Sequence, residues 1–331
     1  MNVFAKAWDL LVKALDPNNF NLDDIIGREA FPKNDRTVFN YLREDPRGEF
    51  RALRQKRIDA DLDMGPRDIA PWKATDPWSN KAELKAALGG GFSKPKKMPN
   101  ATYSLPTHMC MRGGALREVE GSVCEHCYAH GKDESNQGGF YPLNNVQRNL
   151  VRNYAALKGN PQRWASALVN QIPKTQDELP FFRWHDSGDL DSPEHLAYLM
   201  AIAESLPDTM FWLPTREWDI TNKVMQARGG RPNNLALRLS LPMIDQTTDN
   251  EINEQRGVEL LPQRHIDMLE QFPDLLTSTV ISRPQNRLSY DDEDLCPAAD
   301  PNKPGSSCED HRCSTCWDTG TPDVGYVNHY E

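Results

Sequence analysis

Short apolar runs alternate with helical segments over residues 100–282, and this alternation limits the fold more than any other feature of the chain. Strands are expected at 102–106, 179–186, 209–215, 234–241 and 277–282. Helices are expected at 144–159, after Ser192, and at 220–228. Strands that alternate with helices form parallel βαβ units. We therefore expect an α/β fold, a partial TIM-like parallel βα barrel, with an open doubly wound sheet as the alternative.

Two of the expected helices carry further signals. Ser192 is a typical N-cap residue, and Pro193 fits the first helical position because proline has no N–H to satisfy there. Apolar residues then recur at helical spacing in both segments: Leu196, Leu199, Ile202 and Leu206 in one, and Val146, Leu150, Tyr154 and Leu157 in the other. Each set forms one apolar face of its helix.

The chain divides into three parts by composition. Residues 1–95 contain no cysteine and are expected to form a mainly helical extension, and the Gly/Lys/Pro-rich stretch 87–100 is predicted to be a linker. Residues 96–290 form the barrel-like core, and 291–331 form a cysteine-rich segment. A helical stretch at 43–57 is rich in arginine and lysine, which suits either an arm that contacts nucleic acid or a partner, or a solvated helix face.

Composition excludes several classes of protein. The net charge of −10 and the isoelectric point near 5.4 argue against binding nucleic acid through overall charge, although a local basic strip could still do so. No stretch approaches the roughly 20 apolar residues of a membrane span. The N-terminus lacks the apolar core of a signal peptide. A cytosolic protein is expected, where thiols stay reduced and clustered cysteines are metal ligands rather than disulfides.

The seven cysteines fall into two groups that are 168 residues apart, in polar loops punctuated by glycine and proline. The first set is Cys110, Cys124 and Cys127; the second set is Cys296, Cys308, Cys313 and Cys316. Four thiolates ending in Cys-x2-Cys indicate a four-ligand site, with zinc as the default and a second 4Fe–4S cluster as the rival. The C-terminal thiols could also complete the first site.

Three thiols, in contrast, leave one metal position unfilled. A 4Fe–4S cube held by three cysteines has one open iron that can bind a substrate or cofactor. His108 and His126 stand near the first set and could supply a fourth ligand that closes the site. The first set therefore predicts a 4Fe–4S cluster with an open iron, unless one of these histidines fills the position.

Polar residues follow the predicted strands in series, and the carboxyl ends of parallel strands meet at one edge of a sheet. These residues are expected to face the cysteine loop: His185, Asp186, Ser187, Gly188 and Asp189, then Thr215 and Arg216, then Arg238 and Ser240, and finally Ser282 and Arg283. The alternative is that they cap helices and satisfy backbone groups.

We assign the candidate roles by side-chain chemistry. His185, Asp186 and Asp189 are candidate acid–base groups, and Arg216 and Arg238 are candidates for binding an anionic substrate or a cofactor carboxylate. Ser187, Gly188, Thr215 and Ser240 are candidate cofactor-binding residues.

Several short motifs occur in a consistent order and carry a resemblance. The stretches YSLPTHMC, CYA, HDSGDL, the run from Arg148 to Asn153 and the C-terminal cysteines resemble the phage "gene product 88" family over about residues 100–318. Cys-x2-Cys-Tyr-Ala, HDSGDL, FWLPTRE and PNNLALRLS are also similar to radical-SAM-like iron–sulfur barrels. The usual loop there is Cys-x3-Cys-x2-Cys, whereas this chain has Cys110-x13-Cys124-x2-Cys127.

This resemblance implies an iron–sulfur enzyme in the host cytoplasm, with S-adenosylmethionine as a cofactor and a nucleotide or nucleic acid as substrate. Two other functions stay open. DSGD at 186–189 and LPTR at 213–216 are similar to motifs of guanine transglycosylases, in which Asp186 or Asp189 would be the nucleophile and zinc would occupy the second set. The third is a non-catalytic module, stapled by metal, whose basic segment 43–57 binds DNA or a host protein.

Overall fold

The protein is described here from a computed structural model that covers residues 81–107, 110–130, 144–282, 295–299 and 306–328. Its centre is a six-stranded sheet in which every neighbouring pair of strands is parallel. The strands are β1 (Thr102–Tyr103), β2 (Phe181–Trp184), β3 (Met210–Thr215), β4 (Leu235–Ser240), β5 (Leu276–Ile281) and β6 (Asp323–Val327). The first four lie within the predicted segments, β5 begins one residue before the segment predicted at 277–282, and β6, which follows the second cysteine set, was not predicted.

The strands lie in the sheet in their sequence order, β1-β2-β3-β4-β5-β6. A doubly wound sheet needs a point where the strand order reverses, and this sheet has none. The α/β class with a parallel sheet is therefore confirmed, and the doubly wound alternative is wrong. Within the described residues β1 and β6 are the edges of the sheet, so closure into a barrel is not confirmed.

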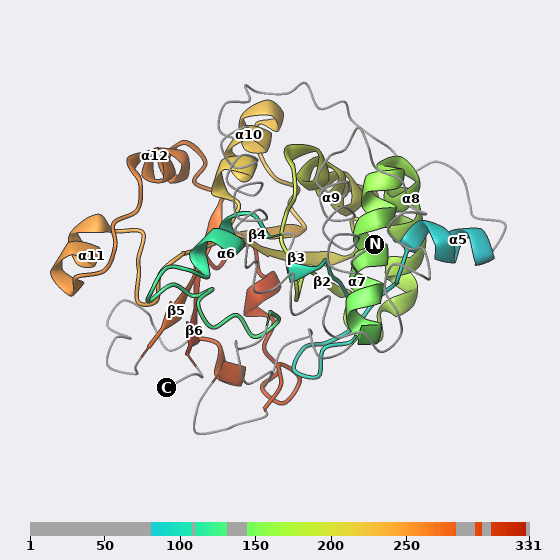
Figure 1. Ribbon diagram of the computed structural model, residues 1–331, viewed down its shortest axis with the longest axis horizontal. Coiled ribbons are helices and arrows are strands. Elements are labelled where there is room, and N and C mark those ends of the chain that lie inside the picture. Colours follow the sequence, from blue (N-terminus) through green and yellow to red (C-terminus); the bar gives the residue numbers. More distant parts are fainter. Residues whose placement is uncertain (1–80, 108–109, 131–143, 283–294, 300–305, 329–331) are drawn as a thin grey trace, which may run out of the picture.

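Eight α-helices lie within the described residues. They are α5 (Lys81–Leu88), α6 (Arg112–Leu116), α7 (Asn144–Gly159), α8 (Pro161–Gln171), α9 (Pro193–Ser205), α10 (Trp218–Arg228), α11 (Asn250–Arg256) and α12 (Gln263–Gln271). Short 3-10 turns add η2 (Ile172–Thr175), η4 (Pro297–Ala299) and η5 (Thr315–Trp317). Figure 1 shows α7, α8, α9 and α10 around one side of the sheet, with the C-terminal segment on the other.

The helix predictions are largely confirmed. The predicted helix at 144–159 has the bounds of α7. Ser192 is the N-cap of α9, where its side chain accepts a hydrogen bond from the backbone N–H of His195, and Pro193 takes the first helical position. Most of each predicted apolar face is buried in the core: Leu150, Tyr154 and Leu157 on α7, and Leu196, Leu199 and Ile202 on α9. Val146 is half-buried, and Leu206 is the C-cap that follows the end of α9.

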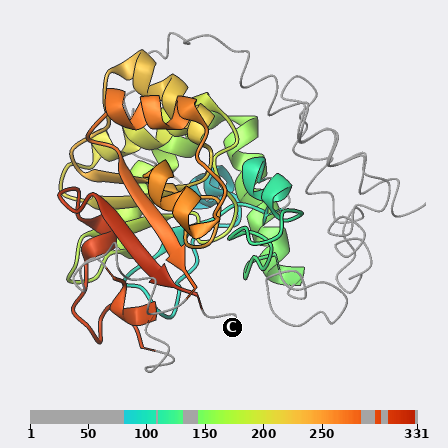
Figure 2. The ribbon, with the colours of Figure 1, turned by 90° about the vertical axis from the view of Figure 1, so that its left-hand side faces the viewer.

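Alternation along the strands separates two faces of the sheet, because successive side chains of a strand point to opposite sides. One face packs against the helices in a single large core: Phe182, Trp184, Phe211, Leu213, Leu235, Leu237 and Leu239. The other face carries Arg183, Trp212 and Arg238, and Trp212 packs with Cys316, Trp317 and Val324 of the C-terminal segment. The second cysteine set is thus folded back onto the sheet (Figure 2).

The predicted linker 87–100 packs against this core. Asn153 of α7 accepts hydrogen bonds from the backbone N–H groups of Gly90 (2.8 Å) and Gly91 (2.9 Å). A Cβ atom added at Gly90 would lie 2.2 Å from the Asn149 carbonyl oxygen, so the segment approaches α7 too closely for a side chain. The domain boundary near residue 95 stays a prediction, since the helices and basic segment predicted before residue 81 lie outside the described residues.

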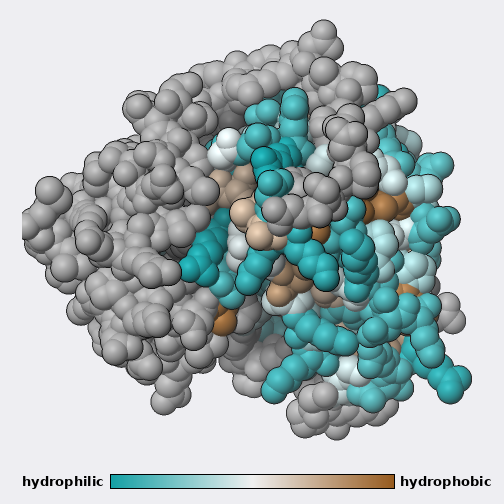
Figure 3. Space-filling model, turned by 90° about the vertical axis from the view of Figure 1, so that its right-hand side faces the viewer, coloured by the Kyte–Doolittle hydropathy of each residue, from teal (hydrophilic) through white to brown (hydrophobic). Residues whose placement is uncertain are grey.

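No helix in the described ranges is long and apolar enough to cross a membrane. On the face seen in Figure 3, the described residues are mainly hydrophilic, with small hydrophobic areas between them.

Candidate functional site

A pocket of about 680 Å³ opens at the carboxyl ends of the strands, and both cysteine sets line it. The first set contributes Cys110, Cys124 and Cys127, and the second set contributes Cys296, Cys308 and Cys316. Polar residues that follow the strands lie on the same wall: His185, Asp186, Ser187, Gly188, Asp189, Arg216 and Ser240. The predicted meeting of cysteine loop and strand ends is therefore present in the structure. Arg238, Thr215 and Ser282 do not line this pocket, and Arg283 lies outside the described residues.

The loop that carries the first set is tied to its surroundings at both ends. The backbone N–H of Val123 donates to the Pro242 carbonyl (3.0 Å), beyond the end of β4. At the start of α6, the backbone N–H of Arg112 donates to the Glu217 carboxylate (2.8 Å), and the Arg112 guanidinium pairs with Asp219 of α10 (2.5 Å). These contacts hold the loop against the carboxyl ends of β3 and β4.

Gly113 lies directly beside two of the three thiols. A Cβ atom placed there would be 3.4 Å from the Cβ of Cys110 and 3.5 Å from the Sγ of Cys124. The loop therefore leaves a small space next to the thiols that any other residue would occupy. Gly113 therefore leaves the thiols of Cys110 and Cys124 without a neighbouring side chain on this side.

Electrostatics link the first set to Arg216. Burial raises the pKa of Cys124 to about 11, and the Arg216 guanidinium opposes this rise. Burial alone would lower the pKa of Arg216, but the thiolate of Cys124 and the carboxylate of Asp189 outweigh it and raise the value. Arg216, predicted to bind an anion, thus lies beside the thiols, where it stabilises their charged form.

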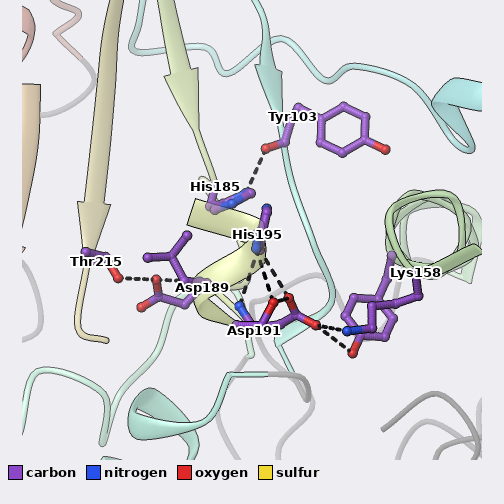
Figure 4. Close-up of polar contacts among 10 residues, drawn as sticks. Tyr103, Lys158, His185, Asp189, Asp191, His195 and Thr215 are labelled. Carbon is purple, nitrogen blue, oxygen red and sulfur yellow. Dashed lines mark hydrogen bonds and ion pairs between the residues drawn. The ribbon is translucent and has the colours of Figure 1, made fainter. Parts of the chain in front are cut away.

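Asp189 fixes the ends of β2 and β3 relative to each other. One oxygen accepts hydrogen bonds from the Thr215 hydroxyl (2.6 Å) and the Leu190 N–H (2.7 Å), and the other accepts from the Arg216 N–H (2.9 Å). Figure 4 shows the pair of Asp189 and Thr215. Burial raises the pKa of Asp189, while these hydrogen bonds act in the opposite direction. Asp189 and Thr215 therefore position the Arg216 backbone.

Two of the predicted cofactor-binding residues hold β1 in place. The hydroxyl of Ser187 donates to the Leu105 carbonyl (2.9 Å), and the Leu105 N–H donates to the Ser187 carbonyl (2.9 Å). Gly188 has a φ of +79°, and a Cβ atom there would lie 2.6 Å from the Cβ of Leu105. Only glycine fits this position. Asp186 accepts a hydrogen bond from the Ser104 hydroxyl, and its backbone carbonyl accepts from the Tyr128 hydroxyl.

His185 is buried at the pocket wall with a defined orientation. Its φ of +55° is in the left-handed region, and its Nδ1 lies 3.1 Å from the Tyr103 carbonyl oxygen. Since a carbonyl only accepts, Nδ1 carries the proton and Nε2 is the acceptor nitrogen. Behind His185, Figure 4 shows His195, Asp191 and Lys158 in a buried network, with Lys158 2.8 Å from Asp191. Burial, and then the charge of His195, lower the pKa of His185 well below its ordinary value.

Arg238, the other predicted anion-binding residue, is fully buried, and its donors are engaged by backbone carbonyls. Four belong to the C-terminal segment: Cys316 (3.0 Å), Thr321 (3.0 Å), Thr315 (2.9 Å) and Asp318 (2.8 Å). The fifth is Thr277 of β5 (3.4 Å). Arg238 therefore holds the segment that carries Cys313 and Cys316 against the sheet. Ser240 lies next to Ser278, with 3.2 Å between the hydroxyl oxygens.

The second set is a separate group of thiols. Burial raises the pKa values of Cys308 and Cys316 to about 12, and Cys296 adds to both rises. The hydroxyl of Tyr326 on β6 lies 3.2 Å from the Cys316 sulfur. The thiols that act on Cys308 and Cys316 belong to this set, and Arg183 and Arg238 oppose the rises. Cys110 and Cys124 instead respond to Cys127 of the first set. Each set of thiols therefore acts on its own members, although both sets line one pocket.

Within the described ranges, no group of three or more His, Cys, Asp or Glu side chains is placed so that it could hold a metal ion. His126 is exposed and lies 3.8 Å from Glu125, and His108 lies outside the described residues. The metal assignments of both cysteine sets therefore stay predictions.

Sequence reasoning did not single out three residues of the pocket wall. Arg183 of β2 and Trp212 of β3 project into it beside each other, and Tyr326 comes from the unpredicted β6. The alternation in FFRW and MFWLPT was the available signal, since it places Arg183 and Trp212 on the sheet face opposite to the leucines and phenylalanines.

Comparison with known proteins identifies the family. The family model described as "Gene product 88" matches residues 72–319, which is 248 of the 331 residues. The chain belongs to the gene product 88 family. This match covers β1 to β5, ends before β6, and includes both cysteine sets. Neither a curated protein nor a solved structure matches the chain.

Proposed function

We propose that this member of the gene product 88 family is a radical-SAM-like iron–sulfur enzyme that acts on a nucleotide or nucleic acid. The observation that carries the proposal is that both cysteine sets line one pocket at the carboxyl ends of a parallel sheet. Enzymes with parallel sheets bind their ligands at this edge. Thiols with only a structural role have no reason to share a pocket of this size with polar strand ends.

Cys110, Cys124 and Cys127 would hold a 4Fe–4S cluster, and Gly113 leaves room beside them. Such a cluster binds each thiolate to a different iron, so it needs a wider arrangement of sulfurs than a single ion does. When bound, it supplies an open iron that can chelate the amino acid part of S-adenosylmethionine and deliver an electron to the sulfonium. Arg216 balances the charge of the thiolates and orients anionic groups nearby.

The four thiols of the second set would hold a second 4Fe–4S cluster or a zinc ion. Arg238 fixes the backbone of Cys316, and Tyr326 contacts its sulfur. Three of the four thiols line the pocket. This position favours a second cluster, since a site that opens on the substrate can serve in chemistry as well as in folding.

His185 is the candidate acid–base group of the pocket. The Tyr103 carbonyl holds its Nδ1 proton, which leaves Nε2 as an acceptor. Because the pKa of His185 is lowered, the ring is neutral at pH 7 and can take a proton at Nε2. Asp186 lies on the same wall, whereas Asp189 is bound to three donors and serves as a positioning residue.

Two further features support the proposal. Six parallel strands in sequence order are the arrangement of an open, partial βα barrel, because right-handed crossovers then put the helices on one side of the sheet. The pocket volume of about 680 Å³ suits a ligand of nucleotide size.

The test is anaerobic purification of the full chain, with iron and acid-labile sulfide analysis and visible spectroscopy. We expect brown protein with broad visible absorption. Cys124→Ala should remove the signal of the first set alone, and Cys316→Ala that of the second alone. Calorimetry with S-adenosylmethionine should show binding that Cys124→Ala abolishes. Colourless protein that contains zinc and takes up no iron on reconstitution would refute the proposal.

A further inference from the structure

The pocket wall between the two cysteine sets is formed by Arg183 and Trp212. The two residues are register partners on β2 and β3, so their Cα atoms lie opposite each other. The Arg183 guanidinium lies over the Trp212 ring, 4.4 Å from the ring centroid. Both side chains line the pocket. A cation and an indole ring are therefore held together at this point of the wall.

Each of these side chains has a buried N–H group without an acceptor. The Nε of Arg183 and the Nε1 of Trp212 have no hydrogen-bond partner among the described residues. Other donors of the Arg183 guanidinium contact the Met98 sulfur (3.0 Å), which is a weak acceptor, and the Tyr128 hydroxyl. A buried donor without an acceptor costs about 1–3 kcal/mol. Two such donors side by side in a pocket indicate that an acceptor is present in the working state.

The carboxylates of the pocket do not supply this acceptor. Asp189 accepts from Thr215, Leu190 and Arg216, and an oxygen of Asp186 accepts from Ser104. Charge balance of the thiolates does not explain the arrangement either. Arg183 does act on Cys308, where it opposes the rise in pKa that burial causes, but an indole N–H carries no charge and needs an acceptor.

We propose that Arg183 and Trp212 bind an oxyanion of the substrate, a phosphate or a carboxylate group. Several lone pairs on such a group can accept both N–H bonds at once, and the guanidinium supplies the charge. This anion site is distinct from Arg216, which acts on the first cysteine set. The inference rests on the proposed function for what happens to the substrate, and it adds the chemical group by which the substrate is recognised.

The experiment is isothermal titration calorimetry on the full chain, purified anaerobically. The probes are nucleoside 5′-monophosphates, the matching nucleosides, inorganic phosphate and citrate. We expect the monophosphate to bind at least about tenfold more tightly than its nucleoside, since a charge-assisted hydrogen bond contributes on the order of a tenfold change in affinity or more. Tight binding of citrate instead would identify a carboxylate as the recognised group.

Variants assign the binding to this wall. Trp212→Phe keeps the ring but removes the N–H, and we expect about tenfold weaker anion binding. Arg183→Gln should reduce binding of the monophosphate to that of the nucleoside. Trp184→Phe is the matched control, because it also removes an unpaired indole N–H but lies on the helix-facing side of β2. Arg163→Gln, in an exposed pair with Glu83, controls for the loss of charge.

The inference is overturned if no anion binds, or if Trp212→Phe and Arg183→Gln bind anions as the wild type does. Loss of visible absorption in Arg183→Gln with anion binding unchanged would assign Arg183 to the second cysteine set and would also overturn it. Iron content is measured separately in every sample. Anion binding by a protein that takes up no iron on reconstitution would therefore refute the proposed function and keep this inference.

Discussion

Replacing Arg238 tests whether this residue holds the second cysteine set in place. Arg238→Met keeps a long unbranched side chain in the same space but removes every donor. Five backbone carbonyls then lose their partner, four of them at 2.8–3.0 Å and on the C-terminal segment. The perturbation therefore concentrates on the stretch from Thr315 to Thr321.

The size of the effect follows from the number of bonds and their burial. A hydrogen bond to a charged group contributes about 1.5–3 kcal/mol, and the contributions within one network are not additive. Disruption of a buried charged network costs about 3–5 kcal/mol. We expect unfolding free energy to fall by about 4 kcal/mol, which corresponds to a decrease in melting temperature of roughly 10 °C for a domain of this size. Arg238→Lys keeps the charge but not the several N–H donors of the guanidinium, and its stability should lie between those of the wild type and Arg238→Met.

Two assays check this expectation. Thermal unfolding followed by circular dichroism gives the stability change. Labelling with a thiol reagent, followed by peptide mass mapping, reports on each cysteine. Cys316 and Cys308 are 6% and 8% exposed, and they should react at least about tenfold faster in Arg238→Met. Cys124, equally buried at 6% but in the other set, is the internal control and should not change.

A surface variant provides the matched control. Arg163→Met removes an arginine whose pair with Glu83 is exposed on both sides, so it should change stability by less than about 1 kcal/mol. If Arg238→Met unfolds at the wild-type temperature and Cys316 reacts at the wild-type rate, the anchoring role of Arg238 is wrong.

Three further predictions concern the scaffold of the site. Gly188→Ala should lower the free energy of unfolding in urea by about 2–4 kcal/mol, since its Cβ would lie 2.6 Å from that of Leu105. Gly229→Ala, at a similar φ of +77° but in open space, should lower it by only about 1 kcal/mol, and equal losses of stability in the two variants would contradict this. Asn153→Ala should cost about 2–4 kcal/mol in thermal unfolding, because Asn153 bonds Gly90, Gly91 and Ser104. Asn222→Ala, which removes an exposed hydrogen bond with Gln226, should be nearly neutral, and a neutral Asn153→Ala would show that the 87–100 segment is not held this way. Burial acts to raise the pKa of Asp219, but His265, Arg112 and Arg264 outweigh it and lower the value well below normal. The stability that Asp219 adds is present above the unfolded-state pKa of about 3.9 and is lost as pH falls below it. Asp219→Asn should therefore be about 1–2 kcal/mol less stable than the wild type at pH 7, and the two should approach equal stability near pH 2. A stability difference that does not change with pH would contradict this.

The strands and two helices could be predicted because their signals are local. NLALRLSL alternates in a way that marks β4, and Ser192-Pro193 marks the start of α9 without any tertiary information. β6 lacked such a signal. It is five residues long, contains Gly325, and is a strand because β5 pairs with it through Asp323–Val327. That pairing joins segments that are about 45 residues apart in the sequence.

The glycines of 87–100 show a second limit. In a sequence, Gly89-Gly90-Gly91 followed by lysine and proline indicates a linker. In the structure, Gly89 and Gly90 allow close approach to the backbone of α7, which is a tertiary requirement that composition does not reveal. The same residue type therefore has two physical uses, and the sequence favoured the more common one.

The sequence also predicted some properties of the candidate site residues and not others. The strand-end rule brought His185, Asp186 and Arg216 to one pocket with the cysteines, because it depends only on the parallel direction of the strands. It did not distinguish residues that face the pocket from residues that support it. Arg238, Thr215 and Asp189 satisfy backbone or neighbouring side chains, and several of their partners lie 26 to 83 residues away along the chain.

The central claim is that the two cysteine sets hold iron–sulfur clusters at one pocket. The most direct measurement is the iron and acid-labile sulfide content of anaerobically purified protein, compared with that of Cys124→Ala and Cys316→Ala. The account predicts iron and sulfide in equal amounts, with each variant losing the share of its own set. Protein that holds only zinc, or that holds no iron at all after reconstitution with iron and sulfide, would contradict it.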